Sequence, residues 1–88
     1  MSSKDLGYQF PYLISLKVFG HNTGDFEQVV YTIVQRHIPE LEREALSSRP
    51  STGDQYVSVT VRFTAQSRGQ LEQIYQELNG HELVLMTL

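Results

Sequence analysis

The sequence predicts an α+β fold, in which four antiparallel strands form one sheet and two helices pack on a single face of it. Two kinds of periodicity lead to this prediction. Residues 56–65 alternate apolar and polar side chains, as a strand with one buried face does. Residues 26–38 and 71–78 repeat apolar side chains every three or four positions, as amphipathic helices do. With a strand before the first helix and after the second, the order is strand–helix–strand–strand–helix–strand.

The first strand is expected to begin after Pro11, because proline has no N–H for a central ladder, and to end at Gly20. Its inner face consists of alternate apolar residues: Tyr12, Ile14, Leu16 and Val18. The central strand, residues 56–65, is rich in β-branched side chains. Its buried residues are Val57, Val59, Val61 and Phe63.

The first helix is predicted from one apolar stripe formed by Phe26, Val29, Val30, Ile33, Val34 and either His37 or Ile38. Asp25 and Glu27 lie in its first turn and Arg36 in its last, which is the charge arrangement that the helix dipole favours. Pro39 ends it.

Residues 40–49 allow two interpretations. Glu40–Leu46 has the composition of a helix, which Pro39 could open. The central strand, however, needs partners, and residues 47–54 are rich in turn-forming types. We therefore expect a charged edge strand within Leu41–Arg49, whose charges discourage edge-to-edge pairing.

The second helix is predicted to begin with a capping box formed by Ser67 and Gln70. Its buried stripe is Leu71, Ile74, Tyr75 and Leu78. Asn79 and Gly80 are expected to form a left-handed C-terminal stop. The short apolar segment Glu82–Leu88 then forms the last strand.

These elements fit a sheet of spatial order 4-1-3-2 with right-handed crossovers, the ferredoxin-like sandwich. We expect a single domain over residues 10–88, preceded by a flexible segment over residues 1–9. In this topology the Gly20–Asp25 loop, the Pro50–Gln55 turn and the Asn79–Glu82 turn share one end of the sheet.

Composition excludes several classes of protein. The chain has 88 residues, no cysteine and a net charge of −3 with interspersed signs, so we expect no disulfide, no thiolate metal site and no basic field for nucleic acid. It has no apolar run long enough for a membrane span or a signal core. We expect a cytoplasmic protein that binds neither membranes nor nucleic acid.

A set of short segments follows one another in a specific order and spacing: Phe10-Pro11, Lys17-Val18, Gly20, Val34–His37, Pro50-Ser51, Tyr56, Ser58-Val59, Gln70–Glu72, Tyr75, Glu77-Leu78, Val84, Met86 and Leu88. Together these segments resemble a family of small bacterial ACT-like proteins typified by YbeD. The resemblance implies an ACT-like fold, similar to the regulatory domains that bind amino acids beside metabolic enzymes. Leu85 departs from the family pattern, which commonly has a basic residue there.

The candidate ligand site is the loop after the first strand: Gly20, His21, Asn22, Thr23 and Gly24. This loop resembles the first-strand-to-helix loop with which ACT domains hold small effectors, and the resemblance implies the same use here. A helix N-terminus after a glycine-permitted turn also presents free N–H groups to an anion. The structural alternative is a helix cap followed by a tight turn.

The candidate protein interface is the last strand: Val84, Leu85, Met86 and Leu88. An apolar edge strand invites pairing with a second copy or another protein. Completion of the core is the alternative. The face of the sheet away from the helices is expected to be polar, with Ser15, Lys17, Ser58, Thr60 and Arg62.

No other grouping predicts a site. His21 and His81 should lie at one end, but zinc sites need more ligands at recognisable spacing, so we expect surface histidines and no metal. No serine has a nucleophile-elbow pattern, and the first loop lacks the phosphate-holding arginine of acylphosphatases. Tyr56 is the one aromatic residue on the polar side of the central strand, which disfavours RNA binding.

We therefore expect a regulatory or adaptor module that binds a small effector or a protein, without catalysis and without a cofactor. The alternative is a structural domain that self-associates through its edge strands, as a homodimer would.

Overall fold

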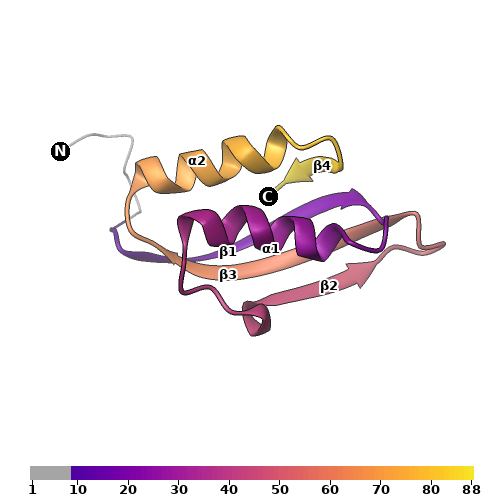
Figure 1. Cartoon of the computed structure of the whole chain (residues 1–88), viewed down its shortest axis with the longest axis horizontal. Helices are drawn as coiled ribbons and strands as arrows, with labels where there is room; N and C mark the ends of the chain where they lie inside the picture. Colours follow the sequence, from indigo (N-terminus) through magenta and orange to yellow (C-terminus); the bar gives the residue numbers. More distant parts are fainter. Residues whose placement is uncertain (1–8) are drawn as a thin grey trace.

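The structure is a computed structural model that describes residues 9–88. It has two layers, a twisted sheet and a pair of helices, α1 (Phe26–His37) and α2 (Arg68–Asn79), that cover one face of the sheet (Figure 1). The opposite face, which we call the open face, is not covered by any described element. The flexible segment expected over residues 1–9 lies, except for Gln9, outside the described residues.

The sheet confirms the predicted topology. Its strands are β1 (Tyr12–His21), β2 (Leu46–Pro50), β3 (Tyr56–Ala65) and β4 (Val84–Thr87). They lie in the order β2-β3-β1-β4, which is the expected 4-1-3-2 counted from the other edge, and every pair is antiparallel. β1 continues one residue beyond the predicted end at Gly20, because His21 still pairs with Tyr56.

The core lies between the sheet and the helices, where the two periodicities place it. Leu16 faces Val61 and Val18 faces Val59 across β1 and β3, and all four side chains are fully buried. The helices contribute the predicted stripes, of which Phe26, Val30, Ile33, Val34, Leu71, Ile74 and Leu78 are buried. Tyr12, which the alternation predicts on the inner face, is exposed at the first position of β1, although its partner Ala65 is buried.

The segment before β2 corrects the extent of the predicted edge strand. A strand does lie on the outer edge of β3, but it begins only at Leu46. A 3₁₀ turn, η2 (Arg43–Ala45), precedes it, with the Ala45 N–H donating to the Glu42 carbonyl at 2.9 Å. Leu41 is buried and holds this segment on the core. The glutamates of residues 40–44 therefore lie beside the sheet and not in it.

Helix α2 begins as predicted and ends differently. The Gln70 N–H donates to Ser67 Oγ at 3.1 Å, and Gln70 Oε1 accepts from the Gln66 N–H at 2.7 Å. Gly80, however, is right-handed at φ −84°, so the left-handed stop is wrong. Its N–H continues the helical pattern to Gln76, and the His81 N–H then closes a further turn on Leu78. Successive right-handed turns lead into β4, which requires no left-handed residue.

The two helices are joined by a polar cluster that the sequence did not reveal. Arg36 Nη2 lies 3.0 Å from one carboxylate oxygen of Glu77, and the His37 ring hydrogen-bonds to the other. Gln70 Nε2 also donates to the His37 carbonyl at 3.0 Å. Because these contacts join residues at least 33 positions apart, they fix the helix pair through tertiary and not local interactions.

Candidate functional site

The three predicted loops gather at one end of the sheet (Figure 1). The Asn22 N–H donates to the Gln55 carbonyl at 3.0 Å, and Asn22 Nδ2 donates to the Asp54 carbonyl at 3.1 Å. The His21 N–H donates to the Leu83 carbonyl at 3.0 Å. Hydrogen bonds therefore tie the candidate ligand loop to both neighbouring turns.

Within that loop the two glycines have different surroundings. A Cβ on Gly20 would lie 2.2 Å from the Phe26 ring and 2.5 Å from the Leu83 carbonyl oxygen, so Gly20 is closely packed. Gly24 has φ +91° and no atom within 4 Å of the corresponding position. Thr23 Oγ1 donates to Asp25 Oδ1 at 2.6 Å, and Asp25 makes no side-chain cap on α1. The open part of the loop is therefore the turn at Gly24.

The two histidines of this end make separate contacts. The His21 ring packs against Tyr56, with centroids 5.8 Å apart. His81 Nδ1 accepts a hydrogen bond from the Leu83 N–H at 3.1 Å. Among residues 9–88 no three side chains of the metal-ligating types gather into a cluster.

The candidate interface on β4 contains a bulge. Phe19 faces Met86 but Gly20 faces Val84, so Leu85 is the extra residue of β4. As a result Leu85 and Met86 are both exposed, by 53% and 48%, and Leu88 by 64%. Val84 instead packs partly against the core. The predicted interface therefore divides into one residue of the core and three on the surface.

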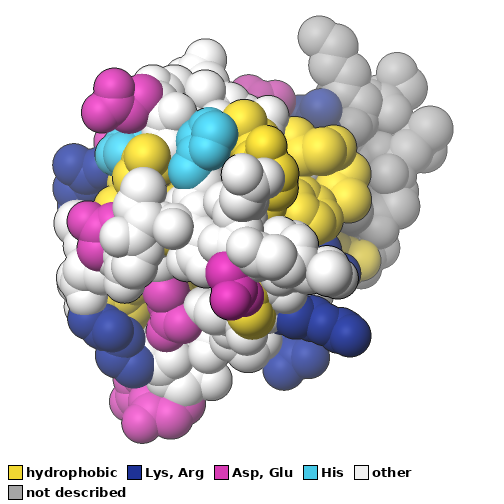
Figure 2. Space-filling model, turned by 90° about the vertical axis from the view of Figure 1, so that its right-hand side faces the viewer, with side chains coloured by type: hydrophobic (Ala, Val, Ile, Leu, Met, Phe, Trp, Pro, Cys, Tyr) yellow, Lys and Arg dark blue, Asp and Glu magenta, His cyan; other side chains and the backbone are white. Residues whose placement is uncertain are grey.

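The exposed side chains of β4 continue across the open face. Phe19 lies between Met86 on β4 and Ser58 on β3, and it shares a hollow of about 260 Å³ with Tyr56 and Pro50. We call Phe19, Tyr56, Met86 and Leu88 the apolar band. Figure 2 shows hydrophobic side chains gathered on one side of this end of the molecule, next to a histidine. The sequence contained this signal, because Phe19 has the same parity as the outward residues of the first strand.

The charges of the open face all have one sign. The five predicted polar residues do point outward, since they share the parity opposite to the buried side chains. Arg49 joins them, because it pairs with outward-facing Ser58. Within residues 9–88 no strand contains an Asp or a Glu, whereas Lys17, Arg49 and Arg62 all lie on this face. The open face therefore combines an apolar band with cations.

Comparison with known proteins establishes the family. Residues 6–88 match the family described as "Protein of unknown function (DUF493)". The chain belongs to the DUF493 family. This result confirms the resemblance to the YbeD-like proteins that the sequence predicted.

Several bacterial relatives support this DUF493 assignment over nearly their whole length. A UPF0250 protein of Paraburkholderia phytofirmans is 33% identical over 92% of this chain and 91% of its own. Those of Neisseria gonorrhoeae and Vesicomyosocius okutanii are both 36% identical, over 91% and 99% of this chain and 88% and 95% of theirs. No helix in residues 9–88 of this DUF493 chain is long and apolar enough to cross a bilayer.

Proposed function

We propose that the chain is an ACT-like adaptor module, which acts by binding another protein on the open face of its sheet and not by catalysis. The apolar band supports this proposal most strongly. Phe19 of β1 pairs with Met86 of β4 and lines one hollow with Tyr56 of β3, and Tyr56, Met86 and Leu88 are exposed by 45%, 48% and 64%. Exposed apolar groups that form a contiguous surface favour a protein contact, whereas single exposed residues carry no such meaning.

Charge indicates the kind of partner. Lys17 lies opposite Leu88, and Arg49 lines the same hollow as Phe19 and Tyr56. An apolar partner surface bordered by carboxylates would complement this face, because complementary charge increases both specificity and the rate of encounter. We therefore infer an acidic partner surface.

The hydrogen bonds of four serines support a role without chemistry. Ser48 Oγ donates to Glu27 on α1, Ser51 Oγ accepts from the Tyr56 N–H at 3.1 Å, and Ser67 caps α2. Ser58 Oγ contacts the Arg49 carbonyl at 3.4 Å. Each of these serines has a structural partner, and a nucleophile would instead need an adjacent base.

Cross-linking in an extract of the producing cells, followed by mass spectrometry, tests this proposal. A specific acidic protein should cross-link to the wild-type chain and not to Met86→Asp or Tyr56→Asp. Gln73→Asp, a matched change on the exposed side of α2, should leave the cross-link unchanged. Equal cross-linking by all four chains would exclude the open face as the binding surface.

Self-association is the second candidate, and the exposed side chains of β4 favour it. β4 is an edge strand, and Leu85 and Met86 both face solvent beside it. In this case sedimentation velocity should show a dimer that forms with increasing concentration and is lost in Met86→Asp. A wild-type monomer at all concentrations would remove this candidate and leave the first.

A small effector at Gly24 would make the module regulatory. The turn is open and α1 has no side-chain cap from Asp25, so backbone N–H groups are available to a carboxylate. A titration with a panel of amino acids should then shift the NMR signals of Gly24, Phe26 and Glu27 first. If no amino acid of the panel shifted the signals of these amides, the loop would be excluded as an amino-acid site.

A further inference from the structure

One edge of β3 lacks a partner over its last residues. Pairing with β2 stops at Leu46 and Val61, because η2 turns the chain away at that point. β3 nevertheless continues to Ala65, which pairs with Tyr12 of β1 on the other side. Within residues 9–88, positions 62–65 therefore have a strand on one edge only.

The direction of the free backbone groups follows from the ladder. The Ser51 N–H donates to the Tyr56 carbonyl at 2.8 Å, so Tyr56 directs its carbonyl toward β2. In an antiparallel ladder every second residue bonds to the same side. Arg62 and Thr64 share the parity of Tyr56, and they therefore direct their N–H and C=O groups to the unpaired edge.

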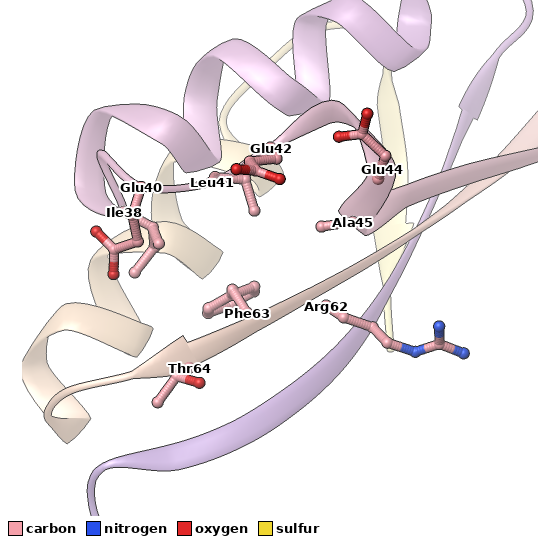
Figure 3. A pocket seen from close by; sticks show the side chains of 9 residues that line it. All are labelled: Ile38, Glu40, Leu41, Glu42, Glu44, Ala45, Arg62, Phe63 and Thr64. Atoms are coloured by element: carbon pink, nitrogen blue, oxygen red, sulfur yellow. The ribbon is translucent and has the colours of Figure 1, made fainter.

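A hollow of about 400 Å³ lies beside this edge, between β3 and the segment that connects α1 to β2. Its apolar lining is Ile38, Leu41, Ala45 and Phe63. Figure 3 shows Glu40, Glu42 and Glu44 following the connecting segment, with Phe63 below them and the Arg62 side chain extending away from the three carboxylates. The hollow thus has an apolar floor and an acidic rim.

The rim carries three carboxylates without an ion pair among the described residues, because Arg62, which also lines the hollow, extends its side chain away from them. Glu40, Glu42 and Glu44 are exposed, and none of them forms an ion pair with another described residue. The nearest cation in sequence, Arg43, is engaged elsewhere, with its guanidinium 4.6 Å from the centre of the Tyr31 ring. A cation from outside the chain would complement these three carboxylates.

We propose that this edge binds an extended basic segment of another protein by strand addition. The segment would run antiparallel to β3 and pair with the N–H and C=O groups of Arg62 and Thr64. A lysine or arginine side chain would lay its aliphatic stem on the apolar floor and place its charge among the glutamates. Backbone pairing favours a peptide over a free amine, which has no backbone to pair.

A labelled probe peptide of alternating lysine and valine tests this proposal, by fluorescence anisotropy and by NMR. It should bind more weakly as salt increases, because the contributing charges are exposed. The triple variant Glu40→Gln/Glu42→Gln/Glu44→Gln should weaken binding by about tenfold, as three exposed ion pairs together would. The Arg62 and Thr64 amides should exchange more slowly in the complex.

Control variants separate binding at this edge from general attraction of a basic peptide to an acidic chain. Glu72→Gln/Glu82→Gln removes two exposed carboxylates elsewhere and should bind the probe as the wild type does. Met86→Asp, which disrupts the open face, should also bind it normally, so failure here and failure of the proposed function are distinguishable. Equal binding of a glutamate–valine peptide, or wild-type binding by the triple variant, would overturn the proposal. The proposal would also be overturned if spermidine, which has no peptide backbone, caused the same NMR shifts as the peptide and the peptide did not slow the hydrogen exchange of the Arg62 and Thr64 amides.

Discussion

The open face of the sheet and the α1–β2 connection differ in charge although both present apolar groups. The open face has Lys17 and Arg49 next to the apolar band and Arg62 farther along β3, with no carboxylate in any strand of residues 9–88. The connection has three glutamates above an apolar floor. A net charge of −3 therefore describes neither surface. Two partners of opposite charge would fit the two regions, and each would be repelled by the other region.

The largest expected effect is a difference in the free energy of unfolding between substitutions on the two faces of β3, a strand that contributes to both regions. Phe63 forms the floor of the acidic hollow and is 4% exposed, so Phe63→Ala should lower the free energy of unfolding by about 3–5 kcal/mol. Tyr56→Ala on the open face should change it by less than about 1 kcal/mol. Urea denaturation measures both. Similar losses would mean that the apolar band belongs to the core.

A smaller loss of stability is expected from a substitution at Gly20, at the end of the sheet where the three loops meet. Gly20→Ala places a methyl group against the Phe26 ring and the Leu83 carbonyl, and overpacking of this kind costs about 1–3 kcal/mol. Gly69→Ala in α2 meets no atom within 4 Å and should be neutral or stabilising by up to about 1 kcal/mol. Thermal unfolding compares the two variants. A harmless Gly20→Ala would show that β1 and β4 can separate easily at the bulge.

The smallest expected effect is a pH-dependent difference in stability between a glutamate in an ion pair, Glu77, and one without an ion pair among the described residues, Glu42. A hydrogen bond from His37 holds the pKa of Glu77 below its ordinary value of 4.5, and the charge of Arg36 acts in the same direction. The folded state therefore binds this proton less readily than the unfolded state. The resulting stability is present above pH 4.5 and is lost as the pH falls through the lowered pKa.

Glu77→Gln should accordingly be less stable than the wild type at neutral pH, and the difference in urea midpoint should disappear in acid. Glu42→Gln, at a carboxylate without an ion pair among the described residues, should change the midpoint little over the same range. If Glu77→Gln kept its deficit below the lowered pKa, lost packing rather than charge would explain it.

The order of the strands and the core could be predicted because both follow from repeating patterns. The two-residue alternation of β3 and the stripe of α1 each extend over ten or more residues, which is enough to identify a buried face. Ser67 and Gln70 form their cap from neighbours in sequence, so this feature was also predictable.

The missed features depend on contacts between distant residues. The start of β2 is set by Leu41 packing on the core, while residues 40–46 have helix-forming composition. The bulge at Leu85 depends on how β4 meets Gly20, and the Glu77 cluster joins the helices through His37, 40 positions earlier in the sequence. The parity of Phe19 places it on the outward side of β1, but its pairing with Met86 and the hollow that it shares with Tyr56 depend on the bulge and on the β3 register.

All charged residues in the strands of residues 9–88 are cations on the open face, and this arrangement affects how a partner protein is oriented before contact. Within residues 9–88 the strands carry only cations, whereas all the carboxylates lie in the helices and connections, where they outnumber the arginines, so the open face is positive relative to the rest of the molecule. A negatively charged protein would turn the sheet toward itself before any contact forms. Added salt should therefore slow association while leaving the lifetime of the complex nearly constant.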